Sequence, residues 1–238
     1  MLNRRTIALT IGAFTLAALC VRLGFWQWHR MEHREHQQAL IERHLGGKPV
    51  PILSVVQRKH PVTEDQEWTR VTATGRFDAR REVTVKFTTR EGRPGADVVT
   101  PLVLADGSAI LVDRGWMATE NTDARPSDVP RPPAGPVTIE GWLRPDNEAG
   151  DNAVVPVAGQ VRAIASHGLR SYVGRDLLPG FVNVQQPRTP GLAPEPRPHV
   201  SHALNFFYAL QWWFFAGLAL IGPFWFNRDP QAKATRSA

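Results

Sequence analysis

The chain has 238 residues, a net charge of +6 and a pI of about 10.2. This length allows one ordinary domain with membrane anchors, or two very small domains. Because the basic residues are scattered and do not form runs, we expect no nucleic-acid partner. The single cysteine, Cys20, excludes an intrachain disulfide, a thiol metal site made by this chain alone and copper relay through a Cys-x-x-x-Cys pair.

A first apolar segment, residues 6–28, follows the basic pair Arg4 and Arg5. A cleaved signal peptide shares this pattern. The segment is longer than a usual signal core and has no convincing small-x-small cleavage site, so we favour an uncleaved transmembrane helix. Residues 29–45 are rich in helix formers and contain neither Pro nor Gly, which predicts that the helix continues beyond the membrane.

Three histidines of this extension, His29, His33 and His36, fall at i, i+4 and i+7. Two imidazoles spaced by four residues can bind zinc or copper. The alternative is a solvated helix face whose histidines have Glu and Arg neighbours. We favour the solvated face and predict no resident metal.

The central residues, 29–202, change to a β pattern after Gly47. Asp106-Gly107 between two apolar runs is a strong hairpin signal. Residues 164–173 are compatible with a short helix, and the segment 151–180 is otherwise hard to interpret. The pattern predicts a small antiparallel barrel or sandwich, with strands at residues 68–77, 82–88, 98–104, 109–116, 137–143 and 181–184.

The stretch from Ala203 to Phe226 holds no charged residue. A helix of this length spans roughly 36 Å, enough to cross a hydrocarbon core of about 30 Å. We interpret it as a second transmembrane helix, the alternative being a buried helix of a soluble domain. Asn205, Tyr208 and Trp212 share one helical face with Gln211 beside them, so we expect that face to meet another helix or a ligand.

The flanking charges predict the orientation of the two helices. Arg4 and Arg5 precede the first, and Arg228, Lys233 and Arg236 follow the second. By the positive-inside rule, residues 1–5 and 227–238 are cytoplasmic and the central domain is extracytoplasmic. A plasma (inner) membrane of a bacterium fits this arrangement.

The sequence contains no P-loop, dinucleotide fingerprint, G-x-S-x-G or H-E-x-x-H motif. Ser166, His167 and His60 could join a catalytic triad from distant positions, but nothing in the sequence places them together. We therefore expect a protein that is not an enzyme. An exported, membrane-anchored enzyme is kept as an alternative.

Short strings in a fixed order resemble the surfeit-locus protein family, the membrane-anchored assembly factors of cytochrome c oxidase. LGFWQWHR resembles its L-G-x-W-Q-x-x-R signature, and YALQWWFF resembles the Y-A-x-Q-W-F start of its last helix. The string Gly92–Trp116 is similar to its longest signature, with a Gly-Pro-Gly type turn, a V-x-T-P-L strand and a V-x-R-G-W ending. The five matching strings are Leu23–Arg30, Val71–Asp78, Gly92–Trp116, Val137–Pro145 and Tyr208–Phe215.

The resemblance implies a chaperone for the haem-copper catalytic subunit of the oxidase, which assists insertion of haem a or stabilises that subunit. It implies three partners: that subunit, the lipid bilayer and the enzyme that makes haem a. It also implies that haem a itself is bound transiently. The matched strings nominate the following residues for contact with the partner or with haem: Trp26, Gln27, Arg30, Gly75, Phe77, Pro101, Arg114, Gly115, Trp116, Tyr208, Gln211 and Trp212.

Some family members carry a histidine three residues before the tyrosine of the last helix, a candidate haem ligand. Here that position is Asn205, whose amide is a poor axial ligand for iron. His202, or His199, is the substitute ligand that the sequence offers. A haem-delivery protein with a defined iron ligand therefore stays open beside a pure assembly scaffold.

Several of these residues also have plain structural interpretations. Gly75 can mark a bulge or close packing, and Pro101 argues for an edge or a bulge in its strand. Arg114, Gly115 and Trp116 indicate a strand end near the membrane. Tyr208 and its neighbours can serve as contacts between helices and nothing more.

Overall fold

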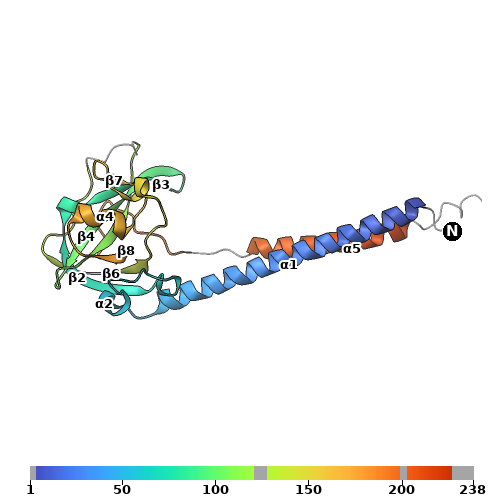
Figure 1. Cartoon of the computed structure of the whole chain (residues 1–238), viewed down its shortest axis with the longest axis horizontal. Coiled ribbons are helices and arrows are strands. Elements are labelled where there is room, and N and C mark those ends of the chain that lie inside the picture. The colour runs from blue at the N-terminus through green and yellow to red at the C-terminus, as the bar shows by residue number, and fades with distance from the viewer. Residues whose placement is uncertain (1–3, 121–127, 199–202, 227–238) are drawn as a thin grey trace, which may run out of the picture. The chain divides into compact units, whose positions relative to one another are not determined.

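The computed structural model describes residues 4–120, 128–198 and 203–226, which fall into two compact units. The helix unit contains residues 1–40 and 199–238, and the barrel unit is Ile41–Pro198. Helix α1 (Arg4–Gly46) runs through the boundary, so its last turns belong to the barrel unit. Figure 1 shows the elements of both units.

The helix unit pairs α1 with α5 (Ala203–Phe226), and both helices are long and apolar enough to cross a membrane. Cys20 packs with Ala17 and Ala216, and Trp28 contacts Phe206. Later residues of α1 therefore contact earlier residues of α5, so the two helices are antiparallel (Figure 1). Small residues at this seam let the helix backbones approach closely.

Five strands of the barrel unit form a closed ring, in the order β2, β6, β8, β5, β4 and back to β2. Their bounds are Arg70–Phe77, Pro136–Arg144, Leu177–Gln186, Ala109–Ala118 and Arg93–Leu104. β3 (Val83–Arg90) and β7 (Gln160–Val161) extend the sheet from β4, and β1 (Val50–Pro51) adds to β2. The expected barrel is present, and closure leaves few unpaired strand edges.

The sheet is mixed, so the expectation of an antiparallel domain was wrong in part. β5 pairs with β8 in parallel, as do β1 with β2 and β3 with β7. Parallel neighbours need a long crossover, and the chain between Ala118 and Leu177 supplies one. It passes through β6, β7 and the helices α3 (Asp151–Val154) and α4 (Ser166–Val173).

Alternation along the strands creates two apolar cores. Ile110 and Val112 of β5 belong to the core inside the ring, to which all five ring strands contribute. Ala109 and Leu111, on the opposite face, belong to a second core with Leu169 of α4. α4 ends where Gly174 takes a left-handed conformation with φ of 70°. The short helices α2 (Ile52–Val55), η1 (Glu64–Gln66) and η2 (Ala79–Arg81) complete this unit.

All six strands expected from alternation are present, with shifted ends. Trp68 precedes β2 and has a φ of 65°, and β4 begins five residues before the expected Val98. Glu91 and Gly92, with φ of 52° and 74°, form the two-residue turn between β3 and β4. The turn expected over Gly92–Gly95 was therefore misplaced, because Pro94 and Gly95 already pair as strand.

Candidate functional site

The seam between α1 and α5 is built from aromatic rings over a glycine. A Cβ on Gly24 would overlap the indole of Trp213, so only glycine admits this ring here. The Trp213 ring lies 5.5 Å from Phe25 and 5.9 Å from Trp28, between ring centroids. Packing of this kind holds helices together where the hydrophobic effect gives no driving force.

Two amides of this unit have buried atoms without a hydrogen-bond partner among the described residues. They are Oε1 of Gln27 on α1 and Nδ2 of Asn205 on α5, whose side chain is only 7 % exposed. An unpaired amide in an apolar environment costs free energy. The two atoms are complementary, one an acceptor and the other a donor.

Four of the nominated helix residues, Trp26, Arg30, Tyr208 and Gln211, are exposed. Trp26 is 53 % exposed with the Arg30 guanidinium 5.4 Å from its ring centre, and Tyr208 and Gln211 are exposed. On α5 the buried stripe follows Asn205, Ala209 and Ala216. The expected single face is therefore divided, because only Asn205 and the half-buried Trp212 lie on the seam side.

In the barrel unit, Gly75, Phe77 and Pro101 meet where the ring closes. Gly75 pairs with Leu104 and Phe77 with Leu102, and the Asp78 amide donates to the Pro101 carbonyl at 2.9 Å. Pro101 is buried within strand β4 and pairs with Leu111 of β5, so it does not lie on an outer edge of the sheet. It lies between the part of β4 that pairs with β3 and the part that pairs with β2, where a missing N–H is tolerated.

Arg114 is buried in β5 and joins three elements through hydrogen bonds. Its Nη2 donates to Glu82 Oε2 at 2.6 Å and to the Pro130 carbonyl at 2.7 Å, and its Nε donates to Thr100 Oγ1 at 2.9 Å. Arg114 is 2 % exposed and Glu82 5 % exposed. Burial lowers the Arg114 pKa, and the charge of Glu82 opposes that shift. These hydrogen bonds hold Glu82, just before β3, and Pro130 against the ring.

Asp113, the neighbour of Arg114, is buried and forms no ion pair with the described residues. The Gly115 amide donates to its Oδ1 at 2.9 Å and Asn183 Nδ2 to its Oδ2 at 2.7 Å. Burial, helped by the charge of Asp97, raises the Asp113 pKa to about 7. The side chain therefore exchanges a proton near neutral pH.

Gly115 and Trp116 hold the segment that leads toward α5. Trp116 and Ala193 exchange two backbone hydrogen bonds of 2.8 Å, and Gly115, with φ of 127°, has room only for hydrogen, since a Cβ would lie 2.6 Å from the Ala193 oxygen. Arg90 fastens the same segment, donating to the Pro194 carbonyl at 2.9 Å and to Glu195 Oε2 at 2.6 Å. β5 continues past Trp116 to Ala118, so these residues do not end the strand.

A cavity of about 610 Å³ lies between the tip of the β3–β4 hairpin and this segment. Arg90, Asp97 and Trp116 line it, but Arg90 is already bound to Asp97 at 2.8 Å. Burial raises the Asp97 pKa against the charge of Arg90. The cavity is thus walled by a neutralised cluster.

The sequence matches the model of the SURF1 family over residues 14–217. The chain belongs to the SURF1 family. It is 29 % identical over 219 residues to uncharacterized SURF1-like proteins of Mycobacterium bovis and Mycobacterium tuberculosis, covering 91 % of this chain and 80 % of each relative. It is also 29 % identical over 108 residues to the cytochrome oxidase assembly protein SHY1 of Saccharomyces cerevisiae, covering 45 % of this chain and 27 % of the yeast protein.

The nominated residues of this SURF1-family chain thus lie in two places, the helix unit and the part of the ring formed by β2, β4 and β5. The candidate ligand His202 and its substitute His199 lie outside the described residues. Within the described part of the chain no group of three or more His, Cys, Asp or Glu could hold a metal ion, the stripe at His29 included. Sequence reasoning missed Asp113 and Arg90. The adjacent charges of Asp113 and Arg114 inside the apolar run of β5 could have pointed to Asp113.

Proposed function

We propose that the chain is a membrane-anchored assembly factor for a haem-copper cytochrome c oxidase. It assists insertion of haem a into the catalytic subunit or stabilises that subunit while haem enters. The observation that carries the proposal is the family match over residues 14–217, with support from the similarity to the yeast assembly protein. The role is non-enzymatic, and an exported enzyme is the lesser alternative.

In this proposal α1 and α5 cross the plasma (inner) membrane with both termini in the cytoplasm. The lengths of the two apolar helices and the basic residues that flank them support this arrangement. The exposed apolar side chains along both helices are then in contact with lipid. The barrel unit is extracytoplasmic.

The proposed contact with the client is the outward polar and aromatic set of the helix unit. Trp26, Arg30, Tyr208 and Gln211 are exposed, and a transmembrane helix of the catalytic subunit can satisfy their polar groups. Inward residues such as Gln27 and Trp212 instead position the two helices.

In this proposal haem a is the group that the catalytic subunit receives. At the position where some family members carry histidine, the buried Asn205 offers an amide, which does not fit as an axial ligand. We therefore propose no ligation step at this position. Transient contact with haem a and with the enzyme that makes it is part of the proposal and is tested with it.

The test is deletion of the gene in its own host, followed by reduced-minus-oxidised spectra of the membranes. We expect a several-fold loss of the haem a signal and of oxidase activity, restored by the wild-type gene. A Tyr208→Ala, Gln211→Ala variant should restore less than a Leu210→Ala, Leu218→Ala variant, which alters equally exposed apolar residues of α5. Full oxidase content in the deletion strain would sink the proposal.

A further inference from the structure

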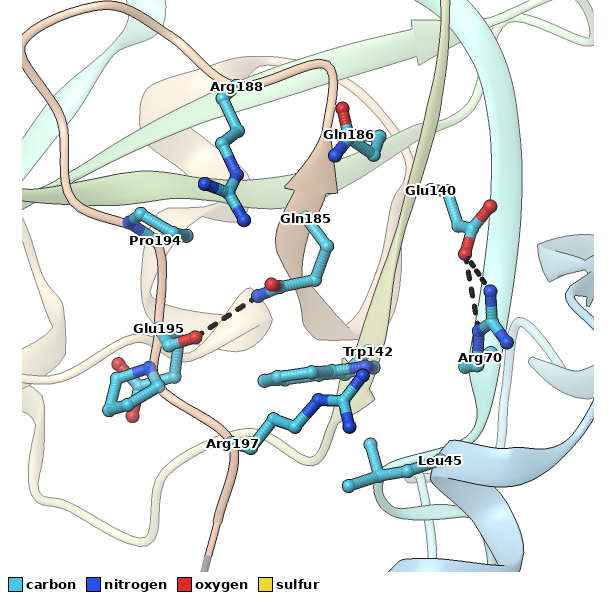
Figure 2. Close-up of a pocket in the computed structure, with 11 residues that line it drawn as sticks. Leu45, Arg70, Glu140, Trp142, Gln185, Gln186, Arg188, Pro194, Glu195 and Arg197 are labelled. Atoms are coloured by element: carbon cyan, nitrogen blue, oxygen red, sulfur yellow. Dashed lines mark hydrogen bonds and ion pairs between the residues drawn. The ribbon is translucent and has the colours of Figure 1, made fainter.

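A second cavity of the barrel unit, about 470 Å³, opens beside the ends of β6 and β8. Figure 2 shows it with its lining side chains. Three arginines line it, together with one tryptophan, one glutamine and two carboxylates: Arg70, Arg188, Arg197, Trp142, Gln185, Glu140 and Glu195. None of these residues belongs to the set that the family signatures nominate.

Both carboxylates of the cavity accept hydrogen bonds from an arginine. Arg70 forms an ion pair with Glu140 and also donates to the Gly47 carbonyl at 3.1 Å. Glu195 accepts from Arg90, which lies in the neighbouring cavity. Because Arg90 also binds Asp97, only Glu140 is matched by a cation of its own, and the three arginines and two carboxylates of the lining leave a net charge of +1.

Arg188 and Arg197 bring positive charge without a matching anion. Neither guanidinium has a hydrogen-bond or ion-pair partner in the described part of the chain, and both residues are exposed. In Figure 2, Arg188 reaches from one rim toward Gln185, while Arg197 extends from the opposite rim beside Trp142. Their charge and donors are therefore available to a ligand.

The walls between the two arginines are held in place before any ligand arrives. Trp142 is 5 % exposed and packs edge-on against Trp68 at 5.9 Å. Gln185 Nε2 donates to the Glu195 carbonyl at 3.2 Å, which fixes the rim that carries Pro194 and Pro196. Side chains that are already fixed lose less conformational freedom when a ligand binds, which lowers the free-energy cost of binding.

We propose that this cavity binds a phosphate group, carried either by a phospholipid headgroup or by a soluble phosphate compound. Two unpaired guanidinium groups supply forked donors that match phosphate oxygens, and the lining as a whole is positively charged. Leu45 lies one residue before the end of α1, and Arg197 lies six residues before α5. Because α1 and α5 are the proposed membrane helices, a lipid headgroup is a candidate source of the phosphate beside a soluble compound, and the test probes both. The inference does not rest on the proposed role in oxidase assembly.

The test titrates the purified full chain in detergent, at low salt, by calorimetry. The probes are pyrophosphate and short-chain phosphatidylglycerol, with short-chain phosphatidylcholine as the zwitterionic reference. We expect Arg188→Gln and Arg197→Gln each to weaken binding by about tenfold, since each removes a charge-assisted contact. Arg175→Gln is the matched control, because Arg175 is exposed on the same unit and does not line the cavity.

Binding of phosphatidylglycerol without pyrophosphate assigns the lipid headgroup as the source, and binding of pyrophosphate assigns a soluble phosphate compound. The inference is overturned if neither probe binds, if phosphatidylcholine binds as well as phosphatidylglycerol, or if Arg175→Gln weakens binding as much as the cavity variants. Because the assay contains no oxidase, its failure would leave the proposed function standing, and the deletion test would leave this site untouched.

Discussion

The two units differ in where their charged and apolar side chains lie. In the barrel unit the buried charged side chains Glu82, Asp113 and Arg114 are all hydrogen-bonded to other parts of the same unit. Among the described residues, buried atoms without a hydrogen-bond partner occur in both units, for example Oε1 of Gln27 in the helix unit and Nη1 of Arg114 in the barrel unit. Most large exposed apolar side chains also belong to α1 and α5. The barrel unit therefore pairs its buried charges internally, whereas the helix unit exposes most of its large apolar side chains to its surroundings.

The largest expected effect comes from breaking the buried ion pair of the barrel. Arg114→Met leaves the Glu82 carboxylate buried without its guanidinium, and we expect the free energy of unfolding to fall by about 3–5 kcal/mol. Urea unfolding followed by tryptophan fluorescence measures this change. Arg58→Met is the control, because its two ion pairs are exposed and should contribute less than about 1 kcal/mol.

A double variant, Arg114→Met with Glu82→Gln, should recover part of the loss by removing the stranded charge. An Arg114→Met protein as stable as the Arg58→Met protein would contradict the claim that the barrel satisfies its own buried charges.

The next effect tests closure of the ring. A side chain at Gly75 would overlap the Val103 carbonyl across the β2–β4 pairing, so Gly75→Val should cost about 2–4 kcal/mol. Gly150→Ala is the control, because its new Cβ meets only Asn152 Oδ1 at 3.5 Å. Equal thermal midpoints for the two variants would show that the β2–β4 contact does not close the barrel.

Another effect concerns pH. The folded-state pKa of Asp113 is about 7, above the ordinary value of 3.8, so the folded state binds the extra proton between these values. Stability should therefore be greatest below pH 4 on account of this group and fall as the pH rises to 7, by at most about 1.4 kcal/mol per pH unit. Asp113→Asn should flatten this slope, because it removes the titrating carboxyl. Asn183 can turn its unpartnered Oδ1 toward the new amide and so keep a hydrogen bond there.

Urea unfolding of both proteins at several pH values measures the slope. A wild-type slope that the Asp113→Asn variant keeps unchanged would assign the pH dependence to other groups.

The smallest expected effect tests the helix pair. Cys20 and Ala216 pack in one cluster, so an Ala216→Cys variant should form a disulfide with Cys20 under mild oxidation. Adding Gly24→Val should lower the yield several-fold, because the new side chain displaces Trp213. Gly12→Val should leave the yield unchanged, since a Cβ there meets nothing within 4 Å. Equal yields in all three proteins would show that the seam does not depend on Gly24.

Local periodicity predicted the elements of the fold well. Alternation placed all six longer strands, and the uncharged run from Ala203 marked the helix of the same residues. The two-residue strands β1 and β7 carry no period to detect. The parallel pairing of β8 with β5 was also beyond sequence reasoning, because strand order depends on how a long crossover packs.

The candidate site was less predictable than the fold. Family strings led to Arg114 and Gly75, but not to what those residues do, since their partners Glu82 and Val103 lie far away in the sequence. Helical spacing alone placed Tyr208 with Asn205, yet Tyr208 is 48 % exposed and Asn205 is buried. Which side of a helix is inside depends on its neighbour, here the glycine and tryptophans of the seam.

The place of β8 in the ring also dictates an order of folding. β8 lies between β5 and β6, so both of these strands keep an unpaired side until residues 177–186 have left the ribosome. A nascent chain of this protein carries open strand edges from the end of β5 at Ala118 to the end of β8 at Gln186, and such edges invite aggregation. The barrel therefore completes only when α5 is the next element to be made.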